Sequence, residues 1–137
     1  MSTKAHKTNT PKSLKLAIVT VSSSRSLVDD KSGHWMKKQA GKKHEVVFHD
    51  VIPDDKDVIE DTIRTIIYEH TPHAILVSGG TGVSPSDVTI EAVRPMFTKE
   101  LSAFGPLFAQ LSYEEIDSSA LLSRATAGVV DRNWDIW

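Results

Sequence analysis

The 137-residue sequence contains no cysteine. A disulfide framework, a thiolate zinc site, an iron–sulfur cluster and a cysteine nucleophile are therefore excluded. It also lacks the run of about 18–20 apolar residues that a membrane-spanning helix needs, so we predict no transmembrane segment. Positive charge is not in excess either, since 16 Lys and Arg stand against 18 Asp and Glu. This balance argues against a nucleic-acid binder but leaves room for a local anion pocket.

The length and the apolar content, 39% of residues, are typical of one soluble globular domain with one core. Residues 1–13 are polar and lack the apolar segment of a secretory signal. We therefore predict a disordered tail over residues 1–13, a single domain over residues 14–137 and a cytoplasmic location.

Short apolar runs alternate with helical patterns along this domain. The run at residues 14–21 is nearly continuous in apolar residues, which is typical of a strand buried on both faces. Residues 56–70 carry isoleucines at helical spacing. Further strands are predicted over 45–52, 74–78 and 125–130, and further helices over 34–42 (opened by Ser32–Gly33), 88–96, 104–112 and 113–122. This order predicts a three-layer, doubly wound α/β fold, with a mostly parallel sheet and helices on both faces.

Three loops follow the carboxyl ends of predicted strands, where ligands bind in open parallel sheets. Residues 22–32 carry hydroxyls, Arg25 and two acids, and residues 53–55 carry Asp54 and Asp55. Residues 78–87 contain the run SGGTG followed by an acid. We expect these loops to meet at one edge of the sheet.

The SGGTG run, Ser78–Gly82, has two interpretations. Glycines allow backbone N–H groups to approach an anion, and a following helix N-terminus would add to such a phosphate cradle. The run is neither G-x-G-x-x-G nor a P-loop, because no lysine follows the glycines. A plain tight turn between strand and loop explains it equally well.

The acids beside these loops are also open to two interpretations. Asp87, Asp54 and Asp55 each precede a predicted helix, and N-capping is the commoner reason for an acid there. Two carboxylates beside a phosphate cradle would instead suit Mg²⁺, which takes one or two carboxylates together with phosphate oxygens. Such an arrangement would favour phosphoryl-group chemistry.

Other candidate sites are weaker. His44 and His49 point to opposite faces of one predicted strand, which argues against zinc. The sequence has no G-x-S-x-G, so a serine hydrolase is not favoured. Arg25 and Arg124 are the cations nearest to the loops, and each is either a phosphate ligand or a surface ion-pair partner.

Taken together, the motifs resemble one known family. They are, in order, VSSSRSLVDDKSG, VIPDD, SGGTGVSPSDVT, FG and LSYEEI…LLSRATAG. This set is similar to the MoaB/MogA family of molybdenum cofactor biosynthesis, which includes a domain of gephyrin, and the resemblance runs from Leu14 to about Val130. It implies an α/β fold that binds molybdopterin and transfers AMP from ATP to the molybdopterin phosphate with Mg²⁺. It also implies a homotrimer or a hexamer.

The resemblance assigns roles to individual residues. It implies that Asp54 and Asp87 handle Mg²⁺ and support the molybdopterin phosphate as nucleophile. The expected contacts to phosphate or pterin come from the hydroxyl, glycine and arginine positions of the motifs: Ser22, Ser24, Arg25, Ser78, Gly79, Gly80, Thr81, Gly82, Ser123 and Arg124.

One departure concerns the end of the sequence. Family members continue through another strand, a PGxP-like loop and a final helix, whereas here Gly128 is followed only by VVDRNWDIW. We therefore expect a domain without that C-terminal strand–loop–helix. This favours, as an alternative to the transferase, a non-catalytic pterin-binding or scaffold protein of the same family. A remoter alternative is an unrelated doubly wound nucleotide-binding domain.

Overall fold

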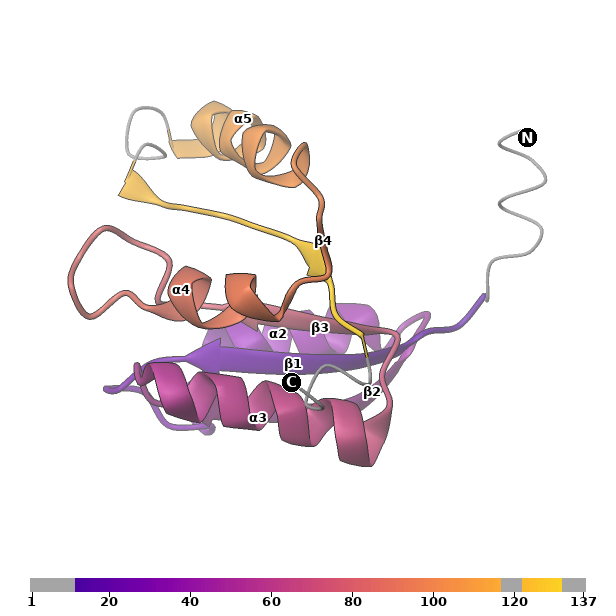
Figure 1. Ribbon diagram of the computed structural model, residues 1–137. Coiled ribbons are helices and arrows are strands. Elements are labelled where there is room, and N and C mark those ends of the chain that lie inside the picture. Colours follow the sequence, from indigo (N-terminus) through magenta and orange to yellow (C-terminus); the bar gives the residue numbers. More distant parts are fainter. Residues whose placement is uncertain (1–11, 117–121, 132–137) are drawn as a thin grey trace.

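The centre of the fold is a three-stranded parallel sheet. In the computed structural model, which describes residues 12–116 and 122–131, the strands are β1 (Lys15–Val21), β2 (Glu45–Ile52) and β3 (Ala74–Ser78), in the order β2-β1-β3. Helix α2 (Lys31–Ala40) lies on one face of this sheet and α3 (Lys56–His70) on the other (Figure 1). The predicted α/β class, with a parallel sheet and helices on both faces, is confirmed.

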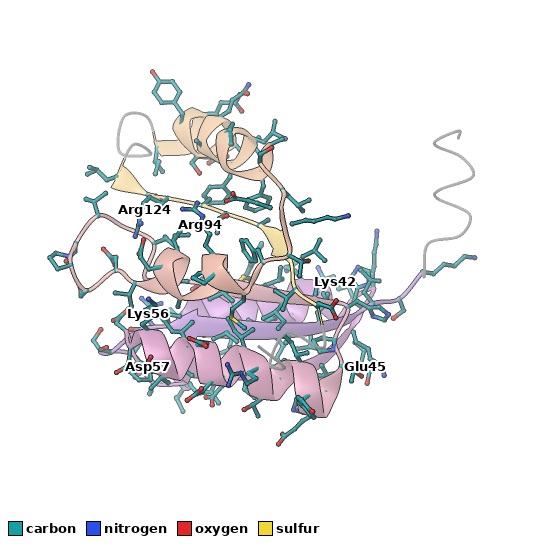
Figure 2. The ribbon with its side chains drawn as sticks, viewed as in Figure 1. Lys42, Glu45, Lys56, Asp57, Arg94 and Arg124 are labelled. Carbon is teal, nitrogen blue, oxygen red and sulfur yellow. The ribbon has the colours of Figure 1, made fainter. Side chains whose placement is uncertain are left out.

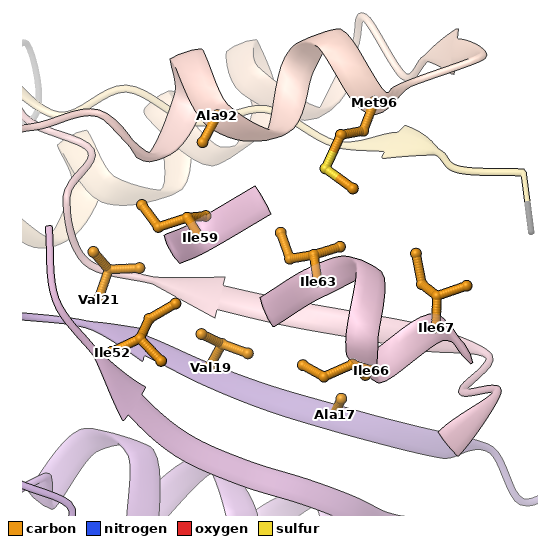
Figure 3. Close-up of a cluster of buried hydrophobic side chains, with 10 residues drawn as sticks. All are labelled: Ala17, Val19, Val21, Ile52, Ile59, Ile63, Ile66, Ile67, Ala92 and Met96. Carbon is orange, nitrogen blue, oxygen red and sulfur yellow. The ribbon is translucent and has the colours of Figure 1, made fainter. Parts of the chain in front are cut away.

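The core explains why the first strand is apolar throughout. Side chains of a strand alternate between faces, so Ala17, Val19 and Val21 share one face of β1 and pack with the isoleucines of α3 (Figure 3). Ile59 and Ile66 of α3 are fully buried there, as the helical spacing predicts. Ile18, on the opposite face of β1, is equally inaccessible to solvent.

The chain after β3 differs from the prediction in several places. The helix predicted over 88–96 consists of α4 (Thr89–Val93) and a single 3₁₀ turn, η1 (Arg94–Met96). Pro95 lacks the N–H that an α-helix needs, which accounts for this change. Residues 104–116 are helical as predicted, but the predicted break after residue 112 is wrong, because one helix, α5 (Phe104–Ile116), runs through it. Residues 117–121 lie outside the described part.

The last predicted strand is shorter than expected and pairs elsewhere. Only Gly128–Val129 forms a strand, β5, and it runs antiparallel to β4 (Lys99–Glu100) in a separate two-stranded sheet (Figure 1). Backbone bonds from Thr98 N to Val129 O (2.8 Å) and from Leu101 N to Ala127 O (2.8 Å) extend this pairing. Two charged residues give no strand pattern, so β4 has no signal in the sequence.

The first helix begins earlier than predicted. Asp30, rather than Ser32–Gly33, is its N-cap, since the Asp30 carboxylate accepts a hydrogen bond from Gly33 N at 3.1 Å. The predicted tail falls almost entirely on residues 1–11, which, like 132–137, lie outside the described part. Within the ranges that the structure describes, no helix combines the length and the apolar character needed to cross a membrane.

Candidate functional site

Three loops leave the same edge of the sheet. Val21 pairs with Ile52, and Thr20 pairs with Ser78, so the carboxyl ends of β1, β2 and β3 lie level. The loops that follow these ends carry the predicted serines, aspartates and glycines. Parallel register thus brings together segments that are about 30 residues apart in the sequence.

The glycine loop, Gly79–Gly82, is held tightly against the sheet. Gly79 has φ 89° and Gly80 has φ 64°, a conformation that residues with a Cβ rarely adopt. A side chain on Gly79 would collide with the Val21 carbonyl, and one on Gly80 would collide with the Thr89 hydroxyl. The interpretation of the run as a tight turn is therefore correct.

The same loop also leaves successive backbone N–H groups unused. Among residues 12–116 and 122–131, the N–H groups of Gly80, Thr81 and Gly82 donate to no acceptor. Successive backbone N–H groups that are not used by the protein can bind an anion. The two sequence interpretations, turn and cradle, are thus compatible.

Asp54 lies between the first loop and the glycine loop. Its carboxylate accepts a hydrogen bond from Ser23 N at 3.2 Å, and its own N–H donates to Ser23 Oγ at 3.0 Å. Asp54 Oδ1 lies 3.3 Å from the position that a Cβ on Gly80 would occupy. The N-cap of α3 is instead Asp55, which accepts from Asp57 N at 2.9 Å and Val58 N at 3.1 Å. The capping interpretation is correct for Asp55 and wrong for Asp54.

Asp87 does not cap a helix either. The N-cap residue of α4 is Val88, which makes no side-chain capping bond. The Asp87 carboxylate accepts instead from Ser84 N at 3.0 Å, and Asp87 N donates to Ser84 O at 2.9 Å. This small turn brings Asp87 Oδ2 beside Gly82. Both predicted functional aspartates therefore flank the glycine loop without being helix caps.

The other predicted residues of the first loop are exposed or fold the loop itself. Ser22 Oγ accepts from Arg25 N at 3.1 Å, and Ser24 is exposed. The Arg25 guanidinium lies 3.8 Å from Asp30 Oδ1. Ser78 is the last residue of β3 and is half-buried next to the loop.

A buried acid that the sequence reasoning missed anchors this first loop. Asp30 is fully buried, and its carboxylate accepts from Thr20 Oγ1 at 2.6 Å, from Gly33 N and from His49 Nε2 at 3.2 Å. Burial by itself would raise the pKa of Asp30, but the hydrogen bonds from Thr20, His49 and Gly33 outweigh it and hold the pKa below its usual value. Asp30 is also the N-cap of α2, and its position shortly before Ser32–Gly33 is the only signal in the sequence that indicates this cap.

The His49 side chain is therefore engaged in a hydrogen bond with the buried Asp30 carboxylate. In the part of the chain that the structure describes, no group of three or more His, Asp or Glu side chains could hold a metal ion.

Arg124 reaches the glycine loop from 42 residues further along the chain (Figure 2). Its Nε donates to Gly82 O at 3.0 Å, and its Nη2 donates to Asp87 O at 3.1 Å. The guanidinium also forms a two-pronged ion pair with Glu91, with Nη2 to Oε1 at 3.0 Å. Its neighbour Ser123 is exposed.

Glu91 is a further residue that the sequence reasoning missed. The hydrogen bond from Arg124 holds the pKa of Glu91 below its usual range, and the same bond raises the pKa of Arg124. Both groups are therefore charged at neutral pH. An open depression of about 400 Å³ lies here, lined by Val83, Ser84, Pro85, Asp87, Val88, Glu91 and Arg124.

The sequence is similar to one known family and to named proteins. Residues 17–133 match the family described as "Probable molybdopterin binding domain". "Molybdenum cofactor biosynthesis protein B" of Bacillus subtilis is 40% identical over 134 residues, which cover 95% of this chain and 78% of that protein. "Probable molybdopterin adenylyltransferase" of Methanocaldococcus jannaschii is 42% identical over 125 residues, covering 86% of this chain and 74% of that protein.

A solved structure shares the fold. The tungsten cofactor synthesizing protein MoaB from Pyrococcus furiosus superimposes with a TM-score of 0.79 at 36% sequence identity. The match covers 89% of this chain and 76% of that chain.

Proposed function

The chain belongs to the molybdopterin-binding-domain family of molybdenum cofactor biosynthesis, and on that premise we propose that it transfers AMP from ATP to the phosphate of molybdopterin. The observation that carries the proposal is the glycine loop with its unused N–H groups, flanked by Asp54 and Asp87. The name of the relative from Methanocaldococcus jannaschii supports the same reaction.

The proposed reaction is a displacement at phosphorus. An oxygen of the molybdopterin phosphate forms a bond to the α-phosphorus of ATP, the bond between the α-phosphorus and its bridging oxygen breaks, and pyrophosphate leaves. Negative charge is present on both reactants, so binding and orienting them side by side is the main task of the protein. The N–H groups of the glycine loop are uncharged hydrogen-bond donors that can bind phosphate oxygens.

The donor set at the loop fits Mg²⁺. The Asp54 carboxylate lies beside Gly80 and the Asp87 carboxylate beside Gly82, and no third His, Asp or Glu joins them among the described residues. Two carboxylates that leave the remaining positions to phosphate oxygens and water are the set that Mg²⁺ prefers. Asp54 and Asp87 would hold the ion, which would supply positive charge to the phosphates of ATP.

The contacts to phosphate or pterin that the resemblance implies for the loop after β1 remain proposals. Ser22, Ser24 and Arg25 lie in the loop after β1, at the edge of the sheet where the glycine loop lies. Their hydroxyl and guanidinium groups suit phosphate or pterin oxygens. The cytoplasmic location also stays a prediction.

Adenylyl transfer can be tested with a matched pair of variants. Protein, ATP, molybdopterin and Mg²⁺ are incubated, and adenylylated molybdopterin is measured. Asp54→Asn should abolish product formation and leave the melting temperature unchanged, because Asp54 caps no helix. Asp55→Asn is the control, since Asn caps a helix about as well as Asp and both activity and melting should stay at the wild-type level.

The outcomes separate transfer from binding. Equal turnover of Asp54→Asn and wild type would refute the catalytic role of Asp54. Molybdopterin binding by the wild type without any ATP-dependent product would select the alternative, a pterin-binding or scaffold protein. The name of the Bacillus subtilis relative, which states the biosynthesis and no reaction, is compatible with that alternative.

Self-association as a trimer or a pair of trimers belongs to the same proposal. Helix α5 has no buried residue, although most of its side chains are apolar. Large apolar side chains on and beside it are 43–63% exposed: Leu101, Phe104, Leu107, Phe108, Leu111, Tyr113 and Ile116. Exposed apolar surface of this kind is typical of a protein–protein interface, which supports association between copies of the chain.

A further inference from the structure

Two residues hold all four carbonyl groups of the glycine loop. The carbonyl oxygens of Gly79–Gly82 accept, in order, from Thr89 Oγ1 at 2.8 Å, Thr89 N at 3.1 Å, Arg124 N at 2.8 Å and Arg124 Nε at 3.0 Å. Thr89 is almost fully buried. The loop is therefore fastened by Thr89, at the start of α4, and by Arg124, which lies 42 residues after Gly82 in the sequence.

This fastening determines where the N–H groups point. In a trans peptide the C=O of one residue and the N–H of the next point in opposite directions, and the described part of the chain has no cis peptide bond. Because the carbonyls of Gly79–Gly82 are directed to Thr89 and Arg124, the N–H groups of Gly80–Val83 are directed away from them. Those four N–H groups donate to no acceptor within the described residues.

The guanidinium of Arg124 is largely occupied by protein acceptors. Of its five N–H donors, one binds Gly82 O, one binds Asp87 O, and two bind the Glu91 carboxylate. A two-pronged bond to phosphate needs two parallel donors, and only one on Nη1 remains. Arg124 is therefore unsuited to bind a phosphate in the way that its position in the motif suggests.

We infer that Thr89 and Arg124 are positioning residues that orient the N–H groups of the glycine loop for phosphate, with Glu91 holding the guanidinium in place. The inference rests on the phosphate-binding role proposed above for the loop. It assigns Arg124 to the support of the cradle and not to the ligand.

Glu91→Gln separates these two roles, because they predict opposite effects. If Arg124 bound phosphate directly, loss of the Glu91 charge would release its donors and tighten binding. If Arg124 positions the loop, the same change loosens the guanidinium and weakens binding. We expect the Kd for inorganic pyrophosphate, measured by calorimetry, to rise about tenfold, which is close to the low end of the range for hydrogen bonds that involve a charged group. A lower Kd would overturn the inference.

Thr89 offers a conservative rescue. Thr89→Ser keeps the hydroxyl that binds Gly79 O, whereas Thr89→Val keeps the shape and removes the hydroxyl. We expect weaker pyrophosphate binding by about tenfold in Thr89→Val and near wild-type binding in Thr89→Ser. Equal binding by the two variants would contradict the role of the hydroxyl.

Arg94 provides the matched control for the ion pair. It also lies on this side of the molecule (Figure 2), and its Nε donates to Glu100 Oε1 at 3.1 Å. Glu100, which also accepts from Thr126 Oγ1 at 2.9 Å, makes no contact with the glycine loop. Glu100→Gln therefore removes the charge of an exposed Arg–Glu pair away from that loop, and pyrophosphate binding should stay at the wild-type level. A loss equal to that of Glu91→Gln would show a general effect of charge and overturn the inference.

Failure of the inference and failure of the proposed function give different results. If wild type makes no adenylylated molybdopterin, the proposed function fails. The orientation of the loop is then read from the amide NMR shifts of Gly80, Thr81 and Gly82 in the ligand-free protein. These shifts should change in Glu91→Gln and stay unchanged in Glu100→Gln, and identical spectra of Glu91→Gln and wild type in this region would refute the positioning role.

Discussion

Replacement of the buried Asp30 by alanine should destabilise the protein more than any single exposed substitution. The change removes the N-cap of α2, which costs about 1 kcal/mol. It also leaves the buried partners Thr20 and His49 without their acceptor, at about 1–3 kcal/mol each. We expect a total loss of about 3–7 kcal/mol out of the roughly 5–15 kcal/mol that stabilises a domain.

Urea unfolding followed by tryptophan fluorescence measures this loss. With an m-value of about 2 kcal/mol per molar urea, the midpoint should fall by roughly 1.5–3.5 M at unchanged m. Asp29→Ala is the control, because Asp29 is exposed and accepts one hydrogen bond, from Ser26 Oγ at 2.8 Å. Its cost should stay below about 0.5 kcal/mol. Equal midpoints for the two variants would refute the reasoning that the buried carboxylate anchors the first loop.

The pH dependence of the same anchor follows from its pKa. Folding lowers the pKa of Asp30 below 3.8, so its ionised form is favoured by the folded state. The resulting stabilisation is fully present above the unfolded pKa and is lost as the pH falls through the folded pKa. The stability difference between wild type and Asp30→Asn, which keeps a capping side chain, should therefore be constant at neutral pH and shrink below about pH 4. A difference that grows on acidification would contradict the lowered pKa.

Three other substitutions test the fold, the loop and the interface. Ile59→Ala should cost about 2–5 kcal/mol in urea unfolding because the side chain is fully buried, whereas Leu76→Ala, 42% exposed, should cost much less; similar costs would contradict the described core. Gly79→Ala should cost about 1–3 kcal/mol, since its φ is 89° and a Cβ would meet the Val21 carbonyl, and wild-type stability would argue against this backbone. Leu107→Gln combined with Leu111→Gln should shift the mass measured by light scattering towards the monomer, and an unchanged mass would refute α5 as the interface.

The sequence by itself determined the central sheet and its principal helix. Two local patterns predicted them: the apolar run of β1 and the isoleucines of α3, because burial requires a fixed periodicity along each element. Pro53 and Pro72 marked where β2 and α3 end. The same logic located Asp54 and Asp87 at the carboxyl edge of the sheet, since parallel strands end at one edge.

The local sequence pattern predicts the elements after β3 less well. Apolar residues are spread along α5 without a buried face, so no periodicity indicates that one helix continues past residue 112. The pairing of β4 with β5 involves two residues on each strand, too few for a pattern. Both features depend on contacts between segments and not on the order of residues within one segment.

Only the tertiary structure decided which acids cap helices and what Arg124 does. Asp54, Asp55 and Asp87 have similar surroundings in the sequence, but only Asp55 turns its carboxylate to the N–H groups of a helix. Arg124 reaches Gly82 across 42 residues, and Asp30 reaches His49 across 19. A hydrogen bond acts over about 3 Å in space, so its partners are determined by how the chain is folded and not by spacing along it.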